Sequence, residues 1–128
     1  MRIGFLSDIH GNREALDACL AQVRRQGVDR LVILGDLVGY GADPAWVVDC
    51  VRSHVERGAL AVMGNHDAAV TRGPRPTMRA EARASIDWTR TRLDASQLDF
   101  LAQLAADQEV VMVDNRGQGF TQVCPGQR

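Results

Sequence analysis

Three short groups of polar residues in the first half of the chain carry side chains that can bind metal ions or move protons. The groups read Asp8-Ile9-His10, Gly35-Asp36 and Gly64-Asn65-His66-Asp67. Their carboxylate oxygens, imidazole nitrogens and amide oxygen form a mixed set that suits Mn²⁺, Fe²⁺ or Zn²⁺, whereas an all-oxygen set would favour Mg²⁺ or Ca²⁺. We therefore expect a divalent metal site built from these three groups.

The spacing within the groups suggests how two ions could be held. Asp8 and His10, two residues apart, can point to the same side of an extended loop and bind one ion. Asp36 can bridge that ion to a second one through its two oxygens, and the amide oxygen of Asn65 can bind the second ion. Two ions about 3.5 to 4 Å apart can clamp the attacking and leaving oxygens of a phosphoester, so the pattern indicates phosphoester hydrolysis.

Each polar group follows a short apolar run rich in Ile, Val and Leu, which is typical of a buried parallel strand. The runs span residues 2–6, 30–34 and 59–63. Helical patterns at 13–26 and 44–57 separate them, and Asp43, Pro44 and Gly58 mark the two ends of the second helix. Strands alternating with helices predict an α/β fold, a right-handed βαβαβ layer with flanking helices over a parallel sheet.

The carboxyl ends of neighbouring parallel strands meet in one crevice, which is where ligands bind in such sheets. All three polar groups stand at such ends. We therefore expect a set of side chains that are far apart in sequence to face one another: Asp8, His10, Asp36, Asn65 and His66.

The second half of the chain continues with a loop and two helices. Glycine and prolines predict a loop at 71–76, whose arginines Arg72 and Arg75 can contact a substrate phosphate, although a solvated role is the more common one. Helical spacing predicts a helix at 79–92. A shorter helix follows, because Asp94 can cap it and Gln97 completes a capping box.

The end of the chain has little periodicity. An apolar run at 110–113 predicts a fourth strand, and nothing regular follows it. We therefore expect one domain at 1–113 and a loose tail at 114–128.

The composition limits the class of protein. The chain has 128 residues, of which 45% are hydrophobic, enough for one domain with its own core. Its formal net charge is -1, without a basic stripe, so we expect no nucleic-acid binding through bulk charge. We also expect no membrane association and a cytoplasmic location, because no apolar run approaches ~18 residues and the N-terminus lacks a signal sequence. Cys19, among Leu16, Leu20 and Val23, is expected in the core.

The three polar groups resemble the first three signature blocks of the calcineurin-like metallophosphoesterases, and the segment 35–41 resembles the small bacterial branch. The resemblance implies an α/β sandwich, of which this chain matches the N-terminal portion, a dinuclear centre with Mn²⁺ foremost, and a small phosphomonoester or phosphodiester substrate. It also implies that Asp8, His10, Asp36 and Asn65 bind metal.

The resemblance further implies two catalytic residues. His66 would stabilise the leaving group or act as an acid, and Asp67 beside it would orient His66. The histidines that complete both metal shells in the family have no counterpart here, because the chain has histidines only at positions 10, 54 and 66.

Incomplete metal shells change what we expect of this chain. We expect one weak to moderate metal ion, a poorly occupied second one, and weak or no hydrolysis by a truncated chain. A non-catalytic metal- or phosphate-binding module completed by a partner chain, and a defunct fragment, are the alternatives. An uncovered sheet edge would favour homo-oligomers.

Overall fold

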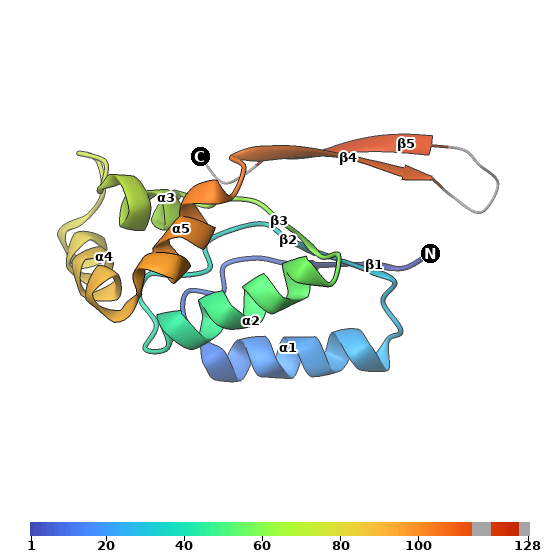
Figure 1. Ribbon diagram of the computed structural model, residues 1–128, viewed down its shortest axis with the longest axis horizontal. Helices are drawn as coiled ribbons and strands as arrows, with labels where there is room; N and C mark the ends of the chain where they lie inside the picture. The colour runs from blue at the N-terminus through green and yellow to red at the C-terminus, as the bar shows by residue number, and fades with distance from the viewer. Residues whose placement is uncertain (114–118, 126–128) are drawn as a thin grey trace.

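A three-stranded parallel sheet lies at the centre of the computed structural model, which describes residues 1–113 and 119–125 (Figure 1). The strands are β1 (Ile3–Leu6), β2 (Arg30–Ile33) and β3 (Leu60–Ala61), in the order β1-β2-β3. Because the strands run in parallel, their carboxyl ends lie at one end of the sheet. The predicted α/β fold with its βαβαβ layer is confirmed.

Two helices cover one face of this sheet and lie side by side along it (Figure 1). α1 (Arg13–Arg25) begins where the Asn12 side chain accepts a hydrogen bond from the Ala15 N–H at 3.0 Å. α2 (Pro44–Glu56) begins with proline at its first position, where a missing N–H costs nothing. Their buried faces are apolar, as the helical spacing predicted: Leu16, Leu20, Val47, Val48 and Val51.

Three further helices gather beyond the carboxyl ends of the strands, at the left of Figure 1. They are α3 (Asn65–Arg72), α4 (Ala80–Arg92) and α5 (Ala95–Gln103). The predicted capping box of α5 is confirmed: the Gln97 N–H donates to Asp94 Oδ1 at 2.8 Å, and the Asp94 N–H donates to Gln97 Oε1 at 2.9 Å. α3 was not predicted, because its eight residues are dominated by polar side chains.

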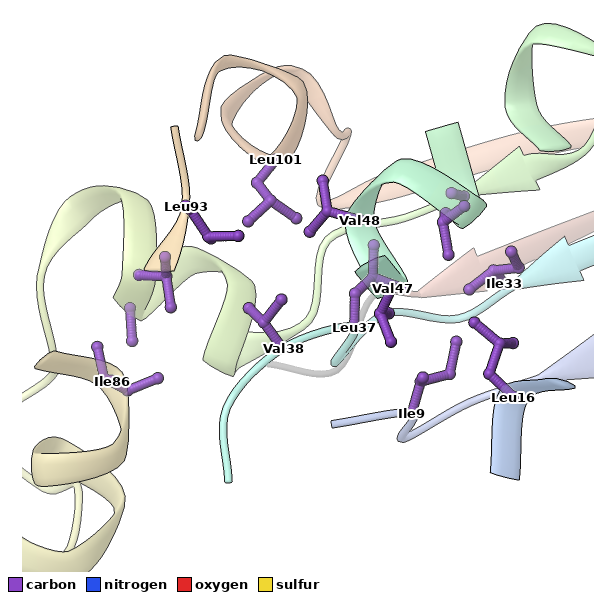
Figure 2. Packing of buried hydrophobic residues seen from close by; sticks show 14 of the residues in the cluster. Ile9, Leu16, Ile33, Leu37, Val38, Val47, Val48, Ile86, Leu93 and Leu101 are labelled. Atoms are coloured by element: carbon purple, nitrogen blue, oxygen red, sulfur yellow. The ribbon is translucent and has the colours of Figure 1, made fainter. Parts of the chain in front are cut away.

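The hydrophobic core continues from the sheet into the loop that follows β2. Figure 2 shows Leu37 and Val38 between the helices, with Val47 and Val48 on one side and Ile86 on the other. Leu37 and Val38 are both fully buried, and each such side chain contributes about 1.5 to 3 kcal/mol relative to an exposed one. The loop that carries Asp36 is therefore held by packing and is rigidly placed.

The segment expected as a loose tail is partly a strand. β5 (Gly119–Pro125) pairs antiparallel with β4 (Asp107–Val113), and the predicted strand at 110–113 lies within β4. The β-branched residues of both segments favour this pairing, in which each strand satisfies the backbone groups of the other. Residues 114–118 and 126–128 lie outside the described residues, and the boundary at 113 stays a prediction.

Two predictions of burial were wrong. β1 is only half-buried, and Phe5 is 44% exposed, because β1 is an edge strand of the described sheet and the helices cover only one of its faces. Cys19 is exposed, because the core face of α1 is narrow and centred on Leu16 and Leu20. In the part of the chain that the structure describes, no helix is both long and apolar enough to cross a bilayer.

Candidate metal centre

The loops that follow β1 and β2 are joined by backbone hydrogen bonds. The Asp8 N–H donates to the Gly35 carbonyl at 3.2 Å, and the His10 N–H donates to the Asp36 carbonyl at 2.9 Å. Asp8, His10 and Asp36 all adopt left-handed backbone conformations, with φ of 56, 49 and 53°. Such conformations cost of order 1 to 3 kcal/mol each outside glycine and persist where surrounding contacts enforce them. These strained conformations turn the three polar side chains toward one another.

The three side chains bring their electron-pair donors close together. His10 Nε2 lies 3.7 Å from Asp8 Oδ1 and 4.0 Å from Asp36 Oδ2, and one ligand atom from each residue lies within 4.8 Å of the others. His10 Nδ1 lies 3.2 Å from the Val38 carbonyl oxygen, so we assign the ring proton to Nδ1. Nε2 then presents a lone pair between two carboxylates, an arrangement that a divalent cation satisfies.

Asp36 connects this donor set to the third polar group. Its side chain is almost fully buried, whereas that of Asp8 is half exposed, so the cluster opens on the Asp8 side. Asp36 Oδ1 accepts a hydrogen bond from the His66 N–H at 3.0 Å, and Oδ2 faces His10. One carboxylate thus fixes α3 with one oxygen and leaves the other for a metal ion.

Glycine is required where the second and third loops meet. A Cβ atom at Gly64 would lie 2.1 Å from Asp36 Oδ1, and one at Gly39 would lie 2.7 Å from His66 Nδ1. Both separations are far shorter than any real Cβ contact, and Gly39 also has a φ of 91°. The two glycines let the backbones approach closely enough to bring His66 beside Asp36.

Asp67 lies beneath the cluster and binds backbone groups. Its side chain is fully buried, and it accepts hydrogen bonds from the N–H groups of Leu37 at 2.9 Å, Val38 at 3.2 Å and Gly64 at 2.9 Å. Burial raises the pKa of Asp67 to about 7, while these N–H donors act in the opposite direction. These bonds hold the second loop against the start of α3, and the orientation of His66 by Asp67 that the resemblance implied stays a prediction.

His66 lies at the mouth of the site with most of its surface covered. Burial lowers its pKa, and the nearby His10 lowers it further, whereas Asp36 and Asp8 oppose the shift. The neutral imidazole is therefore favoured near neutral pH. Nδ1 of His66 is buried and has no hydrogen-bond partner among the residues that the structure describes, and the rings of His10 and Tyr40 lie 4.8 and 4.9 Å away.

Tyr40 is a site residue that the sequence did not single out. Its ring is 58% exposed, it contacts both histidine rings, and its backbone is left-handed with φ of 66°. The Tyr40 N–H donates to Ser85 Oγ at 3.0 Å, which ties the loop to α4. The sequence offered one signal for this site residue, an aromatic residue between Gly39 and Gly41. An aromatic side chain that is this exposed does not contribute to a core.

Two of the hollows that the described residues form lie beside the cluster and beside His66. One, of about 450 Å³, is lined by residues of the first two loops that include Asp8 and His10. The other, of about 260 Å³, is lined by Asn65 and His66 at the start of α3. The structure thus places Asp8, His10 and Asp36 in one donor cluster, His66 against Asp36, and Asn65 in the adjoining hollow.

A family model and a relative of known sequence both match this chain. The family model described as calcineurin-like phosphoesterase matches residues 1–118. A protein of uncharacterised function from Methanocaldococcus jannaschii is 36% identical over 103 residues, which cover 80% of this chain and 41% of that protein.

Two solved structures are similar as well. The crystal structure of a metallophosphoesterase from Sphaerobacter thermophilus is 38% identical with a TM-score of 0.65, and the match covers 89% of this chain and 44% of that one. A hypothetical protein from Pyrococcus horikoshii, 19% identical, shares the fold with a TM-score of 0.74 over 84% of this chain and 49% of that one. The chain therefore spans less than half the length of these three relatives.

Proposed function

Because this chain belongs to the calcineurin-like phosphoesterase family, we propose that it binds a divalent metal ion at Asp8, His10 and Asp36 and hydrolyses a small phosphoester there. The observation that carries the proposal is the donor cluster: three ligand atoms within 4.8 Å of one another, on loops strained to converge. A bound ion would supply Lewis-acid activation of the phosphoryl group and of water.

The donor chemistry supports Mn²⁺ as the ion. Two carboxylates and one imidazole form a mixed nitrogen and oxygen set, which also accepts Fe²⁺ or Zn²⁺. For a second ion, the chain offers Asp36 and the amide oxygen of Asn65, which begins α3. Two donors hold an ion poorly, so we propose one weakly to moderately bound ion and a second position of low occupancy.

The roles of the chain's own groups follow from their placement. During hydrolysis a water oxygen forms a bond to phosphorus, the ester P–O bond breaks, and the leaving oxygen takes a proton. His66 contacts the His10 ring and its backbone N–H is held by Asp36, so we propose that its ring N–H stabilises the leaving oxygen or, in the imidazolium form, gives it a proton. Asp67 acts as a positioning residue, because its bonds go to the backbones that carry Asp36 and His66.

We also propose a substrate class, an oligomeric state and a cellular location for this chain. The absence of a basic stripe in the sequence supports a small-molecule substrate in preference to a nucleic acid. The half-exposed edge strand β1, with Phe5 on it, supports a homo-oligomer. A cytoplasmic location is proposed from the sequence alone.

Replacing His66 by alanine should reduce Mn²⁺-dependent hydrolysis of bis(4-nitrophenyl) phosphate by about 100-fold, because a positioned proton donor contributes about 10²- to 10⁴-fold. His54→Ala is the matched control. His54 lies on α2 and lines a separate pocket, and burial lowers its pKa as it does that of His66. Release of nitrophenolate measures both rates.

The same assay separates the proposal from its alternative. Turnover that both alanine variants retain would contradict the role of His66. Mn²⁺ binding with no turnover by the unmodified chain would favour a non-catalytic metal-binding module completed by a partner chain.

A further inference from the structure

The hollow beside His66 has a size that suits one small group of a substrate. Its volume of about 260 Å³ equals that of eight or nine water molecules at ~30 Å³ each. Pockets that enclose a whole drug-sized ligand measure about 300 to 1,000 Å³. Its lining includes an expected metal ligand, an expected catalytic residue, an aromatic ring, two cations and part of α4: Asn65, His66, Tyr40, Arg75, Arg79 and Ala82. We call this space the arginine hollow.

Two arginines bring positive charge to the hollow that His66 lines. Arg75 and Arg79 both line the hollow, and Arg79 is also the N-cap residue of α4. No side chain caps this helix end, and Ala82 in its first turns lines the hollow, so the partial positive charge of the helix N-terminus adds to that of the arginines. Glu81 lies in the same turn but is exposed and does not line the hollow. The hollow therefore favours an anion.

The hollow that Asp8 and His10 line has the opposite charge, because its lining includes Asp8, Glu14 and Asp43. Tyr40 lines both hollows. An anionic group attached to a substrate at this site is therefore repelled from the acidic hollow and attracted to the arginine hollow.

The arginine hollow is pre-formed, because Arg83 holds the loop that carries Arg75. Its guanidinium donates to three backbone carbonyls of that loop: Arg75 at 3.1 Å, Pro76 at 2.8 Å and Met78 at 3.1 Å. The loop packs further through Met78, which lies against the core. The backbone of this loop is therefore fixed before an anion binds, while the side chains of Arg75 and Arg79 are exposed and can reach the anion.

We propose that the arginine hollow binds a second phosphate group carried on the leaving side of the substrate. The proposal rests on the proposed function, which places the reacting phosphate at the metal donors and the leaving oxygen at His66. Since His66 contacts the His10 ring and also lines the hollow with Arg75 and Arg79, a group that leaves at His66 is next to this hollow. The substrate class is then a phosphoester or phosphoanhydride with two phosphates, the second of which departs with the leaving group.

The test measures anion binding without metal. Pyrophosphate, and separately orthophosphate, is titrated calorimetrically into the full chain in EDTA at low salt. We expect both anions to bind, because the hollow takes one phosphate group. Arg75→Gln and Arg79→Gln should each weaken pyrophosphate binding about five- to tenfold, because each removes one charge-assisted contact.

Arg72→Gln is the matched control. Arg72 ends α3, is exposed, and does not line the hollow, so its loss removes the same charge from the same segment. We expect less than a twofold effect. Equal losses in all three variants, or no binding of either anion, would overturn the proposal.

Two further results keep the inference distinct from the proposed function. ADP should bind as pyrophosphate does, whereas binding of ADP without pyrophosphate would mean that the nucleoside is recognised and would overturn the proposal. The titration contains no metal ion and is independent of the Mn²⁺-dependent hydrolysis assay. Arginine-dependent binding in the titration, together with no hydrolysis in that assay, would contradict the proposed function alone. Hydrolysis with no arginine-dependent binding would contradict this inference alone.

Discussion

Replacing Asp36 by asparagine is expected to reduce Mn²⁺-dependent hydrolysis of bis(4-nitrophenyl) phosphate to the rate measured without metal. Asp36 is the buried member of the donor cluster, and its Oδ2 faces His10 Nε2 at 4.0 Å. Removing a group that only hydrogen-bonds to a metal ligand lowers metal affinity or activity by about 10- to 100-fold. Loss of a ligand charge that serves both proposed ions should cost more than about 100-fold.

Asparagine separates this chemical role from the structural one. Asp36 Oδ1 accepts the His66 N–H at 3.0 Å, and the amide oxygen of asparagine can accept the same bond. The variant should therefore fold with an unchanged circular dichroism spectrum. Asp87→Asn, at an exposed position on α4, controls for the loss of one charge. Full hydrolysis by the Asp36 variant would show that the cluster is not the metal site.

Replacing Asp67 by alanine is expected to lower the free energy of unfolding by about 3 to 5 kcal/mol. The fully buried carboxylate accepts three backbone N–H groups, those of Leu37, Val38 and Gly64. Each buried donor left without a partner costs about 1 to 3 kcal/mol. The midpoint of urea denaturation, followed by circular dichroism, gives the change.

Asp99→Ala is the control for this stability measurement, because Asp99 is an exposed aspartate on α5. Its replacement should change the free energy of unfolding by less than about 0.5 kcal/mol. A loss below about 1 kcal/mol in the Asp67 variant would mean that water or other groups satisfy the three N–H donors. Asp67 would then not be what holds the second loop to α3.

The convergence of the three polar groups could be predicted because it follows from topology. Apolar runs ending in polar residues gave three parallel strands, and parallel strands bring their carboxyl ends together. Asp8, His10 and Asp36 meet as expected from that rule alone. Their left-handed backbone could not be predicted, because none is a glycine and the strain is imposed by hydrogen bonds between loops distant in sequence.

The hydrogen bonds of Asp67 to the second loop could not be predicted from the sequence. Successive residues at the start of a helix point in different directions, so the position beside His66 does not identify the partners of Asp67. Its partners Leu37 and Val38 lie about thirty residues away along the chain, and no local pattern identifies them. The sequence did not indicate the contributions of Tyr40 and Arg79 to the site either, because both depend on the packing of α4 beside the second loop.

The account depends most on a metal ion bound by Asp8, His10 and Asp36, and a calorimetric titration of Mn²⁺ into the full chain tests this most directly. The prediction is one ion per chain, bound weakly to moderately, with affinity reduced more than about 100-fold in Asp36→Asn and unchanged in Asp87→Asn. Two tightly bound ions, no binding, or equal affinity in Asp36→Asn and the unmodified chain would contradict it.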